Sequence, residues 1–199
     1  MGVGSRAEQR ERTARRIRLA AREVLLERGY DAATITEIGK RAGVAHGTVL
    51  MHFGSKSELA TEAFTDQISE LVESAWAQHR MSDDPVDDFA GMVKVLYAWY
   101  HRNADVARHL LRESIFSTGS AGDRYTAEVL STIERWSDLI VRHQAAGRID
   151  RRYSATDLAQ SVFATYTFVL LQGVRGRYDS VDDQVAGFRE LVSVLFITT

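Results

Sequence analysis

The scarcity of proline is the feature that most restricts the fold of this chain. Proline occurs once in 199 residues, at Pro85, so long stretches lack the residue that most strongly breaks a helix. Apolar residues recur at spacings of three and four along nearly the whole sequence, which is the period of an amphipathic α-helix. The pattern predicts an all-α fold of about nine helices.

Capping residues mark several of the predicted helix ends. Gly29 is expected to end the first helix. Capping-box patterns at residues 34–37 and 55–58 mark two helix starts, and the Asp-Pro pair at residues 84–85 marks a third. Residues 116–122 read as a loop, and the last two helices are predicted over residues 155–173 and 181–196.

Charge is distributed unevenly along the chain, whose overall formal charge is −2. Residues 1–60 carry 11 Lys and Arg against 7 Asp and Glu, and the remainder is acidic. A basic end joined to an acidic body suggests that the first third meets a polyanion. Before any motif is considered, a solvated charged face explains the asymmetry equally well.

The composition also excludes several kinds of site. The chain has no cysteine, which excludes disulfides, zinc–thiolate sites and cysteine redox sensing. No apolar run approaches the roughly 20 residues that span a bilayer, and the arginine-rich N-terminal segment lacks the apolar stretch of a secretory signal. A cytoplasmic protein without a membrane partner is therefore expected.

Residues 34–53, TITEIGKRAGVAHGTVLMHF, form the most informative segment. A short capped helix, a turn at Gly43 and a second short helix over about residues 45–52 are typical of a helix-turn-helix unit. Gly43 provides the backbone freedom that the turn needs, and Val44 is expected to fill the space between the helices. The second helix would present its N-terminal side chains to base edges in a major groove.

These residues resemble the tetracycline-repressor (TetR) family of transcriptional regulators. The resemblance covers residues 17–63 and rests on several segments in order: IRLAA, ERGYDAATITEIGKRAGV, GTV, HF and SKSEL. It implies an N-terminal helix-turn-helix domain with a basic arm over residues 1–58 and a C-terminal ligand-binding and dimerisation domain over residues 59–199. The implied protein is a homodimeric repressor that binds a palindromic operator and is released by a small-molecule inducer.

The resemblance also implies which residues contact DNA. Helix N-termini suit this task because their free amide groups point at the anion. Independently of the resemblance, the arginine cluster of residues 6–18 is interpreted as an arm that follows the phosphates or enters a minor groove, with a frayed, solvated leader as the alternative. The arm is favoured for Arg15, Arg16 and Arg18. Together with the resemblance, this gives the predicted DNA-binding residues, which are Arg16, Thr34, Thr36, Ala45, His46, Gly47, Thr48, Met51, His52 and Lys56.

Two departures from the family pattern leave an alternative open. The family usually has Ser where Ala45 stands and Tyr where Leu50 stands. Ala is a poor helix cap, at a cost of about 1 kcal/mol, and Leu cannot hydrogen-bond a phosphate. The alternative is a ligand-binding or partner-binding helical module whose operator binding is weakened or lost.

The C-terminal helices are expected to hold an inducer and a second copy of the chain. Inducer pockets of the family are apolar with a few polar anchors, and the favoured lining residues are Tyr97, Tyr100, His101, Trp136 and Tyr166. By the same resemblance the dimer interface includes Leu158, Val162, Phe163, Tyr166, Leu170, Phe188, Leu191, Val192 and Leu195. The sequence does not separate interface residues from those of the protomer core.

Catalysis and metal binding have little support. No Ser-His-Asp cluster, nucleotide-binding glycine loop or pair of catalytic carboxylates stands out, so an enzyme on the helical body is only a distant alternative. His101, Asp105 and His109 share a four-residue spacing, but a helix break between them would spoil the geometry of a metal site. No cofactor and no metal are expected. Activation rather than repression stays open.

Overall fold

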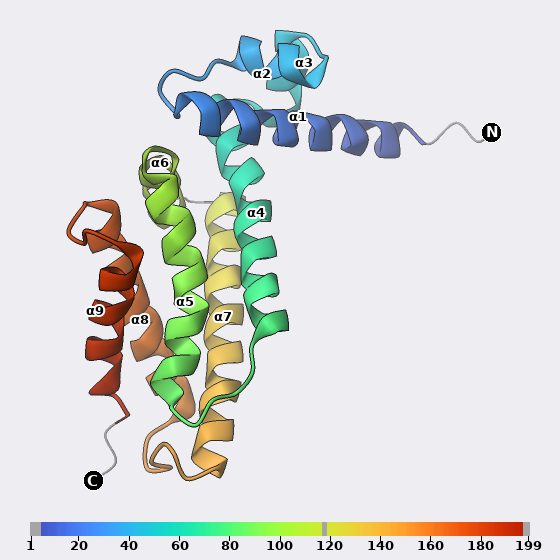
Figure 1. Cartoon of the computed structure of the whole chain (residues 1–199). Helices are drawn as coiled ribbons and strands as arrows, with labels where there is room; N and C mark the ends of the chain where they lie inside the picture. The colour runs from blue at the N-terminus through green and yellow to red at the C-terminus, as the bar shows by residue number, and fades with distance from the viewer. Residues whose placement is uncertain (1–4, 117–118, 197–199) are drawn as a thin grey trace. The chain divides into compact units, whose positions relative to one another are not determined.

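The described residues form α-helices and no strand (Figure 1). The structure, a computed structural model, describes residues 5–116 and 119–196. Its nine helices within these ranges are α1 (Arg6–Arg28), α2 (Ile35–Ala42), α3 (His46–Phe53), α4 (Lys56–Gln78), α5 (Pro85–Arg102), α6 (Ala104–Phe116), α7 (Gly119–Ala145), α8 (Ala155–Val174) and α9 (Val181–Ser193). The predicted all-α class is confirmed.

The chain divides into two compact units. The first contains the described residues up to Ser69 together with Asp105–Ser114 of α6, and the second contains Glu70–Ala104 and the described residues from Ile115 onward. The helices α4 and α6 therefore contribute residues to both units. The predicted boundary between a DNA-binding domain and a ligand-binding domain, after residue 58, is a division by function. The two compact units do not test it, so it stays a prediction.

The first unit is built on a small core shared by α1, α2, α3 and the start of α4. Its fully buried side chains include Ile17, Leu25, Ile38, Val49 and Leu59. The helix α2 packs against both α1 and α3, as can be followed in Figure 1. Burial of these apolar side chains holds two helices of eight residues each, which are too short to be stable alone in water.

Local chemistry sets the helix ends of the first unit. The Thr34 side chain accepts a hydrogen bond from Glu37 N while the Glu37 carboxylate accepts one from Thr34 N, which completes the predicted capping box. Gly43 ends α2 with a left-handed φ of 67°, a conformation that glycine adopts without steric cost. Ser55 Oγ accepts from Glu58 N at 3.1 Å at the start of α4.

The second unit has an aromatic core. In this unit α5 packs against α8 and α9, and α7 packs against α8. The Tyr97 and Tyr166 rings stack with centroids 5.6 Å apart, and Trp136 meets Phe89 edge to face at 5.5 Å. Such pairs add to the stabilisation that comes from burying their area.

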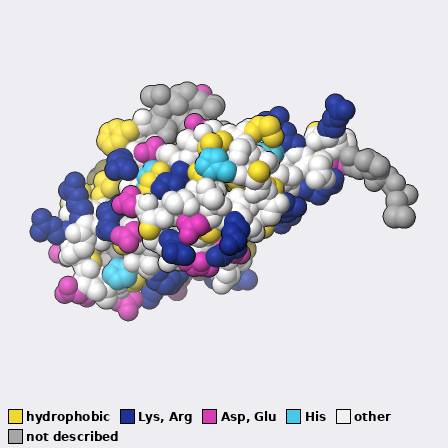
Figure 2. Space-filling view, turned by 90° about the horizontal axis from the view of Figure 1, so that it is seen from above, with side chains coloured by type: hydrophobic (Ala, Val, Ile, Leu, Met, Phe, Trp, Pro, Cys, Tyr) yellow, Lys and Arg dark blue, Asp and Glu magenta, His cyan; other side chains and the backbone are white. Residues whose placement is uncertain are grey.

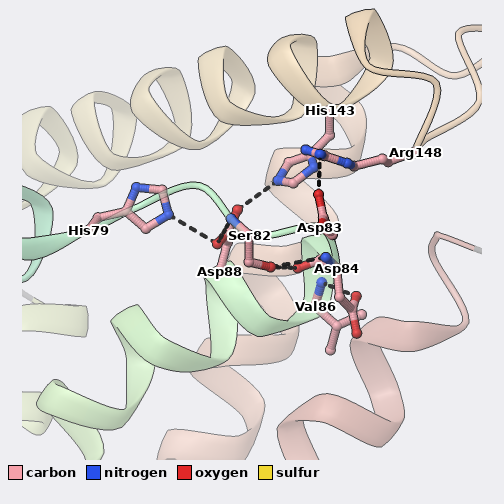
Figure 3. A network of polar contacts seen from close by, with 8 residues as sticks. All are labelled: His79, Ser82, Asp83, Asp84, Val86, Asp88, His143 and Arg148. Atoms are coloured by element: carbon pink, nitrogen blue, oxygen red, sulfur yellow. Dashed lines mark hydrogen bonds and ion pairs between the residues drawn. The ribbon is translucent and has the colours of Figure 1, made fainter.

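A buried polar network closes one end of this core (Figure 3). Asp88 on α5 is 4% exposed. Its carboxylate accepts a hydrogen bond from His143 Nε2 at 2.7 Å and another from Ser82 N at 2.9 Å. His79 Nε2 lies 3.2 Å from the same carboxylate. Because an unpaired buried carboxylate is costly, these groups fix the end of α7 and the segment before α5 around one side chain.

The predicted loop at residues 116–122 is wrong where the structure describes it. Phe116 is the last residue of α6 and α7 already begins at Gly119, while residues 117 and 118 lie outside the described residues. Glycine and serine disfavour helix only weakly, and tertiary context overrides such propensities. The final helix ends at Ser193 rather than at residue 196. None of the described helices is both long and apolar enough to cross a membrane.

Candidate functional site

The helix α3 has one buried side and one exposed side. Val49 and Phe53 are 0% and 4% exposed and anchor the helix to the first unit. On the other side Met51 is 72% exposed, and His46 and Gly47 are also exposed. This exposed side is available to a partner. Thr48 and His52, two other predicted DNA-binding residues, are half-buried.

The first turns of α2 and α3 lie next to each other. Thr36 Oγ1 and His46 Nδ1 are 3.1 Å apart, which joins the N-terminal turn of α2 to that of α3. Ala45 precedes α3 with an extended backbone and caps it with no side-chain hydrogen bond. The first amide groups of α3 therefore keep their capacity to bind an acceptor, and the positive end of the helix favours an anion there.

Two of the predicted DNA-binding residues, Arg16 and Lys56, donate hydrogen bonds to backbone carbonyl groups. One guanidinium nitrogen of Arg16 donates to Ala42 O at 2.9 Å, at the end of α2. Lys56 Nζ donates to Tyr30 O at 2.8 Å and to Ala33 O at 3.0 Å. Both side chains thus stabilise the first unit in the absence of DNA, and their contact with phosphate stays a prediction.

The other basic residues of α1 and α2 are partly neutralised. Arg18 pairs with Glu11 at 2.8 Å and with Asp66 at 3.2 Å, whereas the exposed Arg15 forms no ion pair among the described residues. Arg41 pairs with Glu27 at 2.8 Å and with Glu23 at 3.1 Å.

The ion pair of Arg41 also acts on its partner: its hydrogen bond lowers the pKa of Glu27 below the ordinary value. In the view of Figure 2 basic side chains alternate with acidic ones and form no continuous field. The face seen in this view therefore offers separate basic side chains rather than one basic patch.

The structure adds two features that the sequence reasoning missed. A Cβ at Gly39 would lie 3.0 Å from Val44 O, so glycine allows the close approach of α2 and the turn before α3. A glycine inside a helical pattern is a signal that could have identified it. The buried hydrogen bond between Asp88 and His143 joins residues that lie 55 positions apart in the chain. No local sequence pattern predicts this contact.

Four of the five predicted ligand-binding residues lie in the interior of the second unit. Tyr97, Tyr100, Trp136 and Tyr166 are at most 9% exposed, whereas His101 is exposed. Burial raises the pKa of Tyr97, Tyr100 and Tyr166 above the ordinary value of 10.0, so their phenols are neutral at physiological pH. Tyr97 OH donates to Tyr166 O at 3.1 Å. These residues make up a mainly apolar interior with hydroxyl groups, and ligand contact stays a prediction.

A cavity of about 390 Å³ lies elsewhere in the second unit, between α4 and α5. Its apolar lining includes Ala75, Met92 and Val95, and its polar lining includes Gln78 and His79. None of the predicted ligand-binding residues lines it. The residues that the structure describes contain no group of three or more His, Asp or Glu side chains arranged to hold a metal ion.

The structure separates the predicted dimer residues into two sets. Six are at most 9% exposed within the protomer and belong to its core: Leu158, Val162, Tyr166, Leu170, Phe188 and Val192. Phe163 and Leu195 are half-buried, and Leu191 is 42% exposed. Phe168 on α8 and Val194 just after α9 add apolar surface, with 53% and 61% exposed. The surface that a second copy could cover is therefore smaller than the predicted set.

Comparison with known proteins agrees with this geometry. Residues 17–63 match the family described as "Bacterial regulatory proteins, tetR family". A fatty acid metabolism regulator protein of Bacillus subtilis is 34% identical over 65 residues, which cover 33% of this chain and 30% of that protein. The transcriptional activator FasR of Mycolicibacterium smegmatis is 36% identical over 81 residues, which cover 41% of this chain and 36% of that protein. The matched part thus spans about a third of each relative.

Similarity of fold extends over most of the chain. The structure of the transcriptional regulator FadR from Bacillus subtilis in complex with stearoyl-CoA superimposes with a TM-score of 0.69 and 19% sequence identity. The superposition covers 91% of this chain and 96% of FadR. The match to the bacterial tetR family of regulatory proteins therefore lies in residues 17–63, which contain the helix-turn-helix.

Proposed function

We propose that this protein is a ligand-responsive transcriptional regulator, most simply a repressor. In this proposal a homodimer binds a palindromic operator through α2 and α3, and a small-molecule inducer releases it. The observation that carries the proposal is the exposed side of α3, whose first turn lies beside the first turn of α2. Two-fold symmetry would double the few base contacts that one such helix makes. A regulator of chromosomal DNA would act in the cytoplasm.

The inducer is proposed to be a partly apolar molecule such as a fatty acyl thioester. The FadR structure of similar fold holds stearoyl-CoA, and a fatty acid metabolism regulator is among the relatives. The inducer would act by population shift, because it binds better to the state that cannot engage the operator.

Selection of binding sites from random duplex DNA by the full-length protein tests this function directly. Enriched pseudo-palindromes are expected, with affinity that falls steeply between two salt concentrations as phosphate contacts are screened. Addition of stearoyl-CoA to the selected operator complex is expected to weaken it, and free coenzyme A serves as the control. The proposal fails if no site is enriched at either salt concentration.

A module with weakened operator binding is the second candidate. It is favoured by Ala45, which provides no side-chain cap, and by Leu50, which is 36% exposed and cannot hydrogen-bond a phosphate. The double variant Ala45→Ser, Leu50→Tyr separates the two candidates. A large gain in DNA affinity would support weakened operator binding in the natural sequence, and an unchanged affinity would argue against it. An enzyme is the remaining alternative, which a screen for substrate turnover by the purified protein would reveal.

A further inference from the structure

His109 on α6 is buried within the first unit although it lies far along the chain from α1–α3. Only 5% of the surface of His109 is exposed. Its ring stacks on the Tyr30 ring with centroids 3.4 Å apart and an interplanar angle of 16°. Tyr30 belongs to the segment between α1 and α2. The stack therefore joins α6 to the segment that leads into the helix-turn-helix.

Hydrogen bonds around His109 define its protonation state. An Arg112 guanidinium nitrogen lies 3.3 Å from His109 Nδ1, and because a guanidinium can only donate, Nδ1 accepts. A neutral ring then carries its proton on Nε2, which lies 3.4 Å from Ser57 Oγ. Ser57 Oγ in turn donates to Glu113 Oε2 at 2.9 Å. All of these contacts are satisfied together only by the neutral imidazole.

The same contacts surround Lys56, a predicted DNA-binding residue. Lys56 Nζ holds the carbonyl groups of Tyr30 and Ala33 and lies 4.4 Å from the centre of the Tyr30 ring. His109 therefore supports one side of the Tyr30 ring by stacking, and Lys56 contacts this ring and the backbone before α2. His109 also contacts Ser57, which follows Lys56 in α4.

We propose that His109 is a positioning residue for DNA binding: as the neutral imidazole it holds Tyr30, Ser57 and Lys56 in the arrangement that presents α2 and α3 to the operator. This role rests on the proposed function. Protonation would place an N–H on Nδ1 against the Arg112 donor, and it would put a positive charge beside Arg112 and Lys56. Acidification is then expected to loosen the segment between α1 and α2.

The electrostatic surroundings agree with a neutral ring. The pKa of His109 is lowered from its ordinary value of 6.5, chiefly because burial disfavours the charged form. Arg112 and Lys56 lower it further, whereas Glu113 and Asp31 oppose the shift. The unfolded chain thus binds this proton more readily than the folded one. The contribution of His109 to stability is present above pH 6.5 and is lost as the pH falls through the folded pKa.

Solvent has a route to this cluster. A cavity of about 410 Å³ in the first unit is lined by Tyr30 and His109 together with Arg108 and Arg112. Protons can therefore exchange without unfolding of the unit, and the response to pH is expected to be fast and reversible.

The experiment compares the pH dependence of operator binding in the wild type and in His109→Gln. The glutamine amide can reproduce the acceptor toward Arg112 and the donor toward Ser57, but it does not titrate. Between pH 8 and pH 5 the wild type is expected to lose about threefold more affinity than the variant, because the lowered pKa of His109 delays protonation to the acid end of this range. His46 and His52 on α3 are present in both proteins, so their own titration cancels in the comparison. Identical pH profiles would overturn the proposal.

A second measurement does not depend on DNA. Hydrogen exchange of residues 30–34, corrected for the intrinsic effect of pH, is expected to lose protection on acidification in the wild type and to keep it in His109→Gln. His109→Phe, which keeps a ring to stack but loses both hydrogen bonds, is expected to show low protection and weak binding already at pH 8. Protection that is independent of pH in the wild type would overturn the positioning role, even if no operator were found. If protection depended on pH as expected but no DNA site were found, the proposed function and the DNA-binding part of this inference would both fail. The structural role of His109 would then stand.

Discussion

At the scale of single residues, two glycines of the helix-turn-helix have opposite surroundings. A Cβ at Gly39 would lie 3.0 Å from Val44 O and 3.4 Å from Val49 Cγ2. A Cβ at Gly47 would meet no atom within 4 Å. Both glycines lie in helices, where alanine is intrinsically favoured by about 1 kcal/mol. Packing alone therefore distinguishes the two positions.

Gly39→Ala is expected to lower the free energy of unfolding by about 1 kcal/mol, because crowding against a carbonyl group of the tight turn exceeds the gain in helix propensity. Gly47→Ala is the matched control, and it is expected to raise the same quantity by about 0.5 kcal/mol. Urea denaturation followed by circular dichroism measures both. Equal effects of the two substitutions would show that the close approach at Gly39 is unimportant.

Gly47→Ala also tests the proposed DNA contact. Because the position faces open space in the free protein, a methyl group there can interfere only with a partner. Operator affinity is expected to fall about tenfold while the folded protein becomes no less stable. Fluorescence anisotropy with the selected operator measures this. Unchanged affinity would place the DNA backbone farther from α3 than proposed.

Removal of the Asp88 carboxylate leaves two buried donors unpaired. Asp88→Ala is expected to lower the free energy of unfolding by about 3 kcal/mol, since His143 Nε2 and Ser82 N lose their acceptor. The neighbouring Asp87→Ala is the control, because its carboxylate is half-exposed and pairs with Arg189. That loss is expected to stay below about 1 kcal/mol. Thermal denaturation compares the two variants, and a small effect of Asp88→Ala would refute the structural role of the network.

At the scale of helices, α9 shows how one helix divides its apolar residues. Phe188 and Val192 are fully buried, whereas Leu191 is 42% exposed. The period of the helix places these residues on neighbouring faces, and only contact with α5 and α8 decides which face is covered. The exposed face of α9, with Phe168 on α8, is the surface that the proposed dimer would cover.

Leu191→Glu is therefore expected to shift the protein from dimer to monomer without unfolding it, because the charge would be buried only in the dimer. Leu130→Glu is the control, since Leu130 on α7 is 60% exposed and is not part of the proposed interface. Analytical ultracentrifugation measures the mass, and circular dichroism checks the fold. A dimer that survives Leu191→Glu at micromolar concentration would place the interface elsewhere.

At the scale of the whole molecule, the proposed function requires that operator binding and inducer binding be linked. If the inducer lowers operator affinity by a given factor, the operator must lower inducer affinity by the same factor. A regulator that responds to its ligand is expected to show a factor of about 10 to 100. Calorimetric titration of stearoyl-CoA into the free protein and into its operator complex measures one side of this equality, and DNA titration measures the other. Equal affinities of stearoyl-CoA for the free protein and for the operator complex would contradict the proposed response to the inducer.

Much of the fold could be predicted because its signals are local. The capping box of Thr34 and Glu37, the left-handed Gly43 and the proline start of α5 all lie at predicted positions. Each depends on residues within one helical turn, so spacing in the sequence is enough to define it. The predicted loop was wrong at residue 116 and at residues 119–122, where the structure describes it, because the prediction depended on weak propensities of glycine and serine.

What the sequence by itself determined about this protein is the helical class, most of the helix ends and the helix-turn-helix, whose residues match the tetR family. Tertiary structure decided which apolar residues of α8 and α9 form the core, and it joined Ser57 to His109 and Asp88 to His143 across 52 and 55 residues. The physical reason is that helical periodicity identifies an apolar face but not what covers it. Burial and buried hydrogen bonds depend on how helices that are far apart in the sequence pack together. No short segment of the sequence specifies that packing.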